Sequence, residues 1–253
     1  AGQGGLLDVV LHPQFASNQL VYWSFSEAGD GGTGTAVARG RLDSQRLADV
    51  QVIFRQQPKV GGSNNHFGSR LVWSRDGRHL FVGLGDRFTR KDDAQTLDNH
   101  IGKVVRIDAD GKPAADNPFA SRAGARPEVW SYGHRNIQGA ALHPGTGELW
   151  TVEHGPQGGD ELNVPAAGAN HGWPVITHGR NYGIGTKIGD GTERADVAPP
   201  LRHWIPSIAP SGMAFLTSER YPGWKGSLFM GALRGSHLVR LERSIAVRSL
   251  RLR

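Results

Sequence analysis

The segment GGSNNHFGS at residues 61–69 places His66 among glycine and small polar residues, directly before an apolar stretch. An imidazole titrates near neutral pH, so His66 can accept a proton from an alcohol when a second group fixes its tautomer. Asp86 ends the next apolar stretch, in GLGD at residues 83–86, and is the residue that we expect to orient His66. A purely structural hydrogen bond between the two side chains is the alternative, and the spacing alone does not decide between them.

A second segment, WSYGHRN at residues 130–136, combines a permanent charge with amide groups. The guanidinium of Arg135 can bind a carboxylate through two parallel hydrogen bonds, which predicts an anionic ligand. The same side chain is equally suited to bridging neighbouring sheets through backbone carbonyls. Tyr182, in the glycine-containing loop at residues 178–183, can flank a flat ligand or simply cover the end of a sheet.

The loop EHGPQGGDELN at residues 153–163 is dense in oxygen ligands. Calcium is bound by carboxylates and by backbone carbonyls, which turns made of glycine and proline expose well. The spacing differs from that of an EF-hand, so a calcium site and a solvated acidic turn both remain open.

These candidate residues lie around four similar units, each with an apolar strand, a polar turn and a second apolar strand. The units recur about every 60 to 75 residues. The turns RDGR at 75–78 and PGTG at 144–147 supply glycine where a hairpin needs positive φ. The paired strands are predicted at residues 5–13 with 20–23, 69–74 with 80–83, 139–144 with 148–152, and 212–216 with 227–230.

The composition agrees with an all-β fold. The 253 residues include 36 glycines and 14 prolines, which favours many short strands over long helices. The net charge is +6, but the basic residues are scattered, so we expect no nucleic-acid partner. No apolar run is long enough to insert into a membrane, and the absence of cysteine excludes disulfides and thiolate metal sites.

Taken in order, the motifs resemble those of the soluble aldose sugar dehydrogenases, the family that includes soluble quinoprotein glucose dehydrogenase. They are GQGGLLD at residues 2–8, the His66 segment, HRN at 134–136, GP through DELN at 155–163, GWP at 172–174 and GALR at 231–234. The resemblance implies a six-bladed β-propeller of four-stranded antiparallel blades, with pyrroloquinoline quinone (PQQ) at the mouth of its channel. An ordinary β-sandwich is the alternative that hairpin repetition alone leaves open.

The resemblance also implies roles for individual residues. His66 would take the proton of the sugar's anomeric hydroxyl, with Asp86 as its partner, while hydride passes to the quinone. The carbonyls of Gly155 and Pro156 would hold the calcium ion beside the cofactor, and Glu161 with the carbonyl of His171 would hold a second one. The residues implied to contact PQQ are Gln3, Arg135, Asn136, Tyr182, Ala232, Leu233 and Arg234.

The expected partners are an aldose substrate and an external electron acceptor, in a periplasmic or secreted protein that is a monomer or a homodimer.

Two differences from the family pattern stand out. Arg234 occupies a position where lysine is more common in the family. The planar guanidinium group of arginine there replaces the compact ammonium group of lysine. Family members are longer, so we expect residues 1–253 to form one propeller domain that lacks parts of its first and last blades. A non-catalytic propeller that binds protein or carbohydrate is the alternative function.

Overall fold

The computed structural model describes residues 2–243 and 250–252. The regular secondary structure of this part of the chain is almost entirely β-strand, with one short helix, α1 (Phe15–Asn18), and one 3-10 helix, η1 (Lys91–Gln95). The first sheet consists of β1 (Leu6–Leu11), β2 (Leu20–Gly29), β3 (Gly32–Asp43) and β4 (Arg46–Arg55). The second consists of β5 (Gly68–Trp73), β6 (His79–Leu84), β7 (Lys103–Asp108) and β8 (Val129–Tyr132).

The second half of the chain repeats this arrangement. The third sheet consists of β9 (Ile137–Leu142), β10 (Leu149–Glu153), β11 (Asp160–Asn163) and β12 (Arg202–Trp204). The fourth consists of β13 (Pro210–Phe215), β14 (Leu228–Ala232), β15 (His237–Arg243) and β16 (Leu250–Leu252). Within every sheet each strand pairs antiparallel with the next strand in the chain.

The four predicted hairpins are present as β1–β2, β5–β6, β9–β10 and β13–β14. Gly77 and Gly147 have φ angles of 71° and 76° in the two predicted turns. Only a residue without Cβ adopts these angles at no steric cost, which is why the turns fall where the glycines are. Local sequence therefore determines the innermost pair of strands in each sheet.

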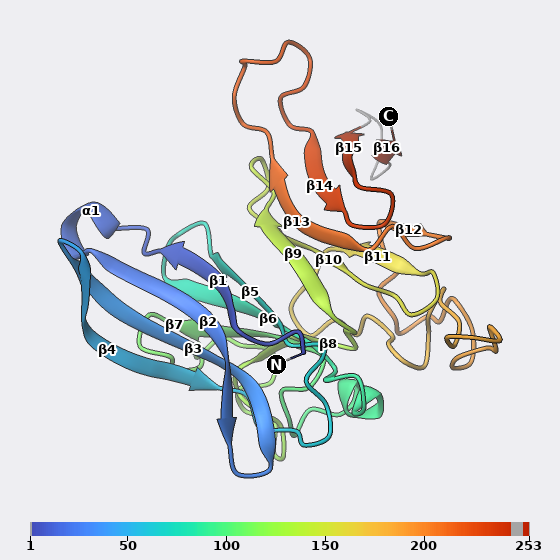
Figure 1. The fold of residues 1–253 in the computed structure, drawn as a ribbon, viewed down its shortest axis with the longest axis horizontal. Coiled ribbons are helices and arrows are strands. Elements are labelled where there is room, and N and C mark those ends of the chain that lie inside the picture. Colours follow the sequence, from blue (N-terminus) through green and yellow to red (C-terminus); the bar gives the residue numbers. More distant parts are fainter. Residues whose placement is uncertain (1, 244–249, 253) are drawn as a thin grey trace.

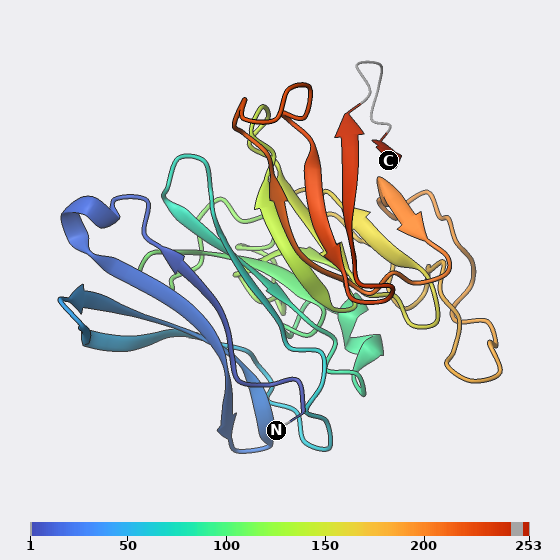
Figure 2. The ribbon, with the colours of Figure 1, turned by 45° about the horizontal axis from the view of Figure 1, so that its top comes forward.

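The four sheets lie side by side, and the first strand of each sheet faces the first strand of the next (Figures 1 and 2). Strand β5 packs between β1 and β9, and β9 packs between β5 and β13. The hydrophobic cores lie between neighbouring sheets. The core between the first two sheets includes Tyr22, Val37, Leu71 and Val82. The core between the last two sheets includes Val152, Leu228 and Met230. The second and third sheets thus have a hydrophobic core on each face, as the blades of a propeller do.

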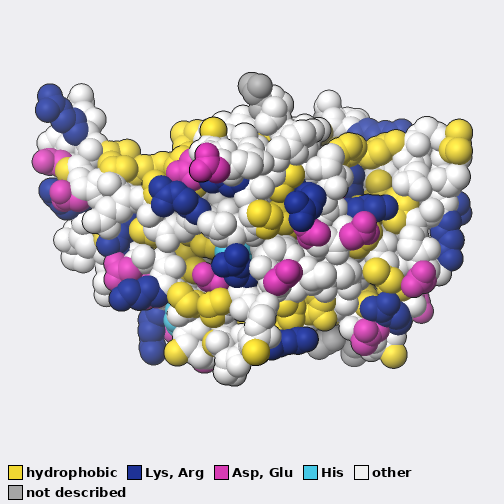
Figure 3. Space-filling model, turned by 90° about the horizontal axis from the view of Figure 1, so that it is seen from below, with side chains coloured by type: hydrophobic (Ala, Val, Ile, Leu, Met, Phe, Trp, Pro, Cys, Tyr) yellow, Lys and Arg dark blue, Asp and Glu magenta, His cyan; other side chains and the backbone are white. Residues whose placement is uncertain are grey.

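The all-β prediction is confirmed, and so are four-stranded antiparallel blades. Residues 2–243 and 250–252 form four such sheets, so six blades and missing parts of the first and last blade stay predictions. No helix in the described part of the chain is long and apolar enough to cross a membrane. On the face seen in Figure 3, basic side chains are interspersed with acidic ones.

Candidate active site

His66 lies in the loop between β4 and β5, and its own backbone is in the left-handed region with φ 52°. A residue with a side chain adopts this conformation only where its surroundings impose it. The side chain of Gln3 accepts a hydrogen bond from the His66 amide at 2.8 Å. A Cβ atom on Gly85 would lie 2.1 Å from the His66 carbonyl oxygen, so the loop sits directly against this glycine. The position of the histidine is therefore fixed from both sides.

The side chain of His66 is 8% exposed, and its Nδ1 lies 2.6 Å from Oδ1 of Asp86. The same oxygen accepts the amide of Phe88 at 2.8 Å, and Oδ2 accepts the indole Nε1–H of Trp173 at 2.8 Å. Both oxygens of the carboxylate are thus held by donors. The expected contact between His66 and Asp86 exists; whether it serves catalysis stays a proposal.

Burial lowers the pKa of His66 below its ordinary value, and the hydrogen bond and charge of Asp86 oppose this effect only in part. His66 is therefore neutral near pH 7. Because Nδ1 faces a carboxylate, that nitrogen carries the proton in the neutral ring, and Nε2 has the free lone pair. The arrangement is that of a general base with a fixed tautomer.

The buried guanidinium of Arg87 fastens the loop that carries the histidine. It donates to the carbonyls of Asn65 at 2.5 Å and Ser63 at 2.8 Å, and to Oγ1 of Thr33 at 2.8 Å. Its Cζ lies 3.6 Å from the centre of the Phe67 ring. Burial lowers the pKa of Arg87 to about 10, which leaves it charged at neutral pH. Sequence reasoning missed this residue, although it directly follows Asp86.

Arg135 lies next to the base, in the connection between β8 and β9. Its backbone carbonyl accepts the amide of Asp86 at 2.7 Å. Its Nη1 donates to the carbonyls of His154 at 2.9 Å and Gly155 at 2.7 Å, and Nη2 donates to the hydroxyl of Tyr182 at 3.2 Å. Among the described residues, the buried Nε of Arg135 has no partner. The guanidinium therefore bonds backbone carbonyls of the loop after β10, within the third sheet and not across neighbouring sheets.

The other residues implied to contact the cofactor lie at different depths. Tyr182 is 59% exposed beside Arg135. Asn136 is buried and accepts the amide of Gly68 at 3.3 Å, which holds the start of β5 next to His66.

The stretch Ala232–Arg234 lies at the end of β14, and the side chain of Leu233 is 67% exposed. The amides of Leu233 and Arg234 donate to the carbonyls of Ala209 and Ile208. In residues 2–243, no hydrogen bond joins this stretch to Arg135 or Tyr182. It adjoins the site through Pro210, which pairs with Ala232 and whose carbonyl lies 2.6 Å from Nε2 of His154, and through Ile208 and Ala209, whose amides bond to Asp160.

The turn at Gly155 and Pro156 is buried and held by Asp160. Oδ1 of Asp160 accepts the Gly155 amide at 2.9 Å, and Oδ2 accepts the amides of Ile208 at 2.7 Å and Ala209 at 2.9 Å. Asp160 therefore fixes the turn and joins the third sheet to the fourth. The Gly155 carbonyl faces the guanidinium of Arg135, so the oxygen donors available at this turn are backbone carbonyls.

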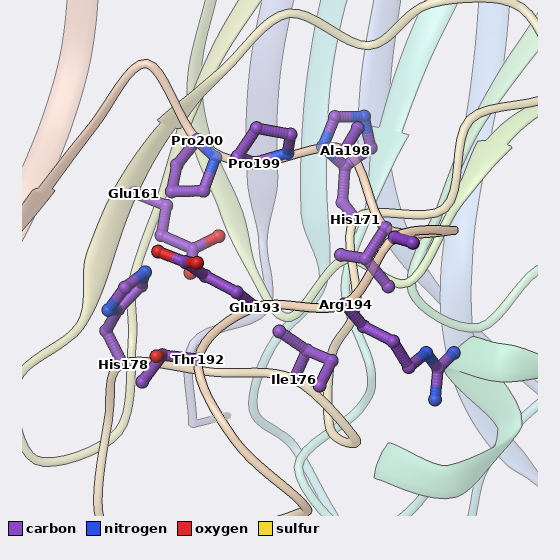
Figure 4. Close-up of a pocket in the computed structure, with 12 residues that line it drawn as sticks. Glu161, His171, Ile176, His178, Thr192, Glu193, Arg194, Ala198, Pro199 and Pro200 are labelled. Carbon is purple, nitrogen blue, oxygen red and sulfur yellow. The ribbon is translucent and has the colours of Figure 1, made fainter.

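Glu161 lies in a separate cavity of about 590 Å³ beside β11. Figure 4 shows its carboxylate pointing toward that of Glu193, with His178 and Thr192 at the same end of the cavity. Burial, followed by the nearby charge of Glu153, raises the pKa of Glu161 to about 8. Glu193 lies on a long loop without a recognisable motif, and sequence reasoning did not find it.

His171 lines the same cavity, and its ring stacks on that of His134 with centroids 4.6 Å apart. Burial lowers the pKa of His171 well below its ordinary value, and within residues 2–243 neither ring nitrogen has a hydrogen-bond partner. Glu153, another residue that the sequence did not single out, accepts His134 Nδ1 at 2.9 Å and the Arg135 amide at 2.5 Å. Glu153 thus connects the cavity of Glu161 to the site of Arg135.

The structure therefore brings the predicted residues together in two neighbouring groups. The first contains Gln3, His66, Asp86, Arg135, Asn136, Tyr182 and the Gly155–Pro156 turn. The second contains Glu161 and His171. A narrow space of about 10 Å³, lined by Arg135, Gly155, Glu161 and Trp173 among others, lies between them.

Comparison with known proteins matches residues 1–251 to the family described as glucose/sorbosone dehydrogenase. The aldose sugar dehydrogenase YliI of Escherichia coli is 47% identical over 243 residues, which cover 94% of this chain and 64% of that protein. The chain thus spans slightly less than two thirds of the length of this curated relative.

Solved structures agree with this match. A crystal structure described as a glucose dehydrogenase superposes with a TM-score of 0.93 at 48% identity, covering 99% of this chain and 72% of the other. The PQQ-bound form of an aldose sugar dehydrogenase from Streptomyces coelicolor superposes with a TM-score of 0.78 at 30% identity, covering 100% of this chain and 68% of the other.

Proposed function

Because this chain belongs to the glucose/sorbosone dehydrogenase family, we propose that it oxidises aldose sugars to lactones with PQQ and calcium. The observation that carries the proposal is the buried pair of His66 and Asp86, with Nδ1 and Oδ1 2.6 Å apart. Oxidation at the anomeric carbon removes a proton from the hydroxyl and a hydride from carbon. A neutral imidazole with a fixed tautomer is suited to accept the proton.

Arg135 supports the proposal for the cofactor. PQQ carries carboxylates, and the buried Nε–H of Arg135 has no partner in the described part of the chain, so a carboxylate would satisfy it. The exposed ring of Tyr182, bonded to the same guanidinium, provides an aromatic surface for a flat ligand. When bound, the quinone supplies the acceptor for the hydride that leaves the sugar. Gln3, Asn136 and the Ala232–Arg234 stretch are proposed as further contacts.

Calcium fits the donor sets of the two groups to different degrees. Glu161 points toward a second carboxylate, that of the exposed residue Glu193, and hard oxygen ligands of this kind are those that calcium prefers. The carbonyl of His171 is proposed as a further ligand there. The Gly155–Pro156 turn offers backbone carbonyls, one of them already bonded to Arg135, so an ion there would need most of its ligands from the cofactor and water.

In the proposed reaction the chain's own residues perform three tasks. His66 accepts the anomeric proton at Nε2. Asp86 holds the ring and stabilises the imidazolium that results. Arg135 holds the cofactor beside the base, since its carbonyl bonds to Asp86 while its guanidinium reaches toward Tyr182. The proposal includes an external electron acceptor and a periplasmic or secreted location.

The test is reconstitution of the full-length protein with PQQ and calcium, followed by glucose-dependent reduction of an electron-accepting dye. We expect His66→Asn to lose activity by about 10²- to 10⁴-fold, the usual contribution of a general base, with PQQ affinity retained. Arg135→Lys is expected to weaken PQQ binding, because an ammonium group cannot reproduce the fork. A reconstituted protein that binds PQQ yet oxidises no aldose would refute the proposal.

A further inference from the structure

The geometry points to Trp173 as a positioning residue for the base: its indole holds the far oxygen of Asp86 and thereby fixes the carboxylate that orients His66. This inference rests on the proposed function, because it concerns how the base of that reaction is kept in place.

The contact is made inside the protein. Trp173 is 7% exposed and Asp86 is 1% exposed, and Nε1 lies 2.8 Å from Oδ2. Indole is a donor only, so the carboxylate cannot be replaced by a donating group without loss of this bond. The other oxygen of Asp86 is used by His66 and by the amide of Phe88. The indole is therefore the side-chain donor that sets the tilt of the carboxylate relative to the imidazole.

Trp173 is itself held by its surroundings. Its amide donates to the carbonyl of Gly133 at 2.9 Å, and its carbonyl accepts Nε2 of Gln95 at 2.7 Å. The ring packs with Ala94 and Ile188 in a small core cluster. With both backbone and ring fixed, the indole can impose its position on Asp86.

The same ring lies beside the proposed cofactor contact. Cζ of Arg135 is 5.3 Å from the centre of the Trp173 ring, within the range of a cation–π contact. One side chain thus contacts both the partner of the base and the guanidinium, so it relates the two positions to one another.

An effect on His66 follows from charge. The charged and titratable groups that act on His66 are Asp86, Arg135, Arg87 and His154. The indole N–H withdraws charge from Asp86, and a carboxylate that loses this donor becomes a stronger acceptor for the imidazolium. Without the indole, the pKa of His66 should therefore rise, and the ring should be less well ordered.

The experiment measures the ring of His66 by NMR in the full-length protein without PQQ, in the unmodified form, in Trp173→Phe and in Trp130→Phe. Trp130 is a matched control, because its Nε1 donates to the Pro165 carbonyl at 2.8 Å and Cζ of Arg106 lies 4.4 Å from its ring. We expect Trp173→Phe to raise the pKa of His66 by about 0.5 to 1, and Trp130→Phe to leave it unchanged. In the reconstituted enzyme, the acid limb of kcat/KM should move to higher pH in Trp173→Phe alone.

Equal His66 titrations in the two variants would overturn the inference. If Trp173→Phe does not fold, the same question is answered by NMR of the unmodified protein. The indole N–H signal of Trp173, assigned by its through-space contacts, must shift as His66 titrates. The indole N–H signal of Trp130 must not shift. Because the NMR readouts need neither sugar nor cofactor, failure of the proposed function would appear separately, as absent dehydrogenase activity in a protein that retains the coupling.

Discussion

Replacing Asp86 by asparagine is the most direct perturbation of the proposed base. The carboxylate accepts three hydrogen bonds, from His66 and Phe88 on Oδ1 and from Trp173 on Oδ2. An amide has one accepting oxygen, so its NH₂ group must face a donor whichever way it turns. If the NH₂ group faces Trp173, a buried indole loses its partner, at a cost of about 1 to 3 kcal/mol.

If the NH₂ group faces His66, the imidazole must change tautomer and carries its proton on Nε2, where the substrate's proton should go. Either orientation also removes the negative charge that stabilises the imidazolium. We therefore expect Asp86→Asn to lower kcat by about 10²- to 10⁴-fold, equivalent to about 3 to 5 kcal/mol in the barrier.

The assay is dye-coupled aldose oxidation in the reconstituted protein, with the free energy of unfolding measured in parallel. Asp110→Asn is the control, because Asp110 forms an ion pair with Arg39 at 2.6 Å but its side chain is 56% exposed. A folded Asp86→Asn protein that keeps kcat within about tenfold of the unmodified enzyme would show that Asp86 does not act through the base.

Three further predictions concern the same sites. Gly85→Ala should lower activity and reduce the free energy of unfolding by about 1 to 3 kcal/mol, since the new Cβ would lie 2.1 Å from the His66 carbonyl. The acid limb of the kcat/KM profile should have its midpoint below pH 6.5, because burial lowers the pKa of His66 and activity needs the neutral ring. Glu161→Gln should lose calcium affinity in calorimetric titration, because it removes a carboxyl group that becomes a charged ligand when calcium displaces its proton.

Each variant has a control or a refuting result. Gly212→Ala adds a Cβ with no atom within 4 Å and should leave stability and activity unchanged. An acid limb of kcat/KM with its midpoint above pH 6.5 would contradict the assignment of that limb to His66. Glu148→Gln removes an exposed carboxylate that only accepts the Thr146 hydroxyl, and equal calcium affinity in both glutamate variants would exclude Glu161 as a ligand.

The sequence by itself determined the β-hairpins and the residue types of the candidate site. The hairpins depend on alternation of apolar residues and on glycines such as Gly77 and Gly147. Both features act over a few neighbouring residues, so they can be recognised in the sequence alone. His66, Asp86 and Arg135 could be singled out because their chemistry is unusual among turns and apolar strands.

Only the tertiary structure decided which of these residues meet and what else meets them. The contact between Asp86 and Trp173 joins residues 87 positions apart, and it exists because the second and third sheets pack together. The same packing buries His66 and lowers its pKa, and it leaves Nε of Arg135 without a partner in the described chain. Burial and long-range distances are properties of packed sheets rather than of any local pattern, so no reading of residue spacing could supply them.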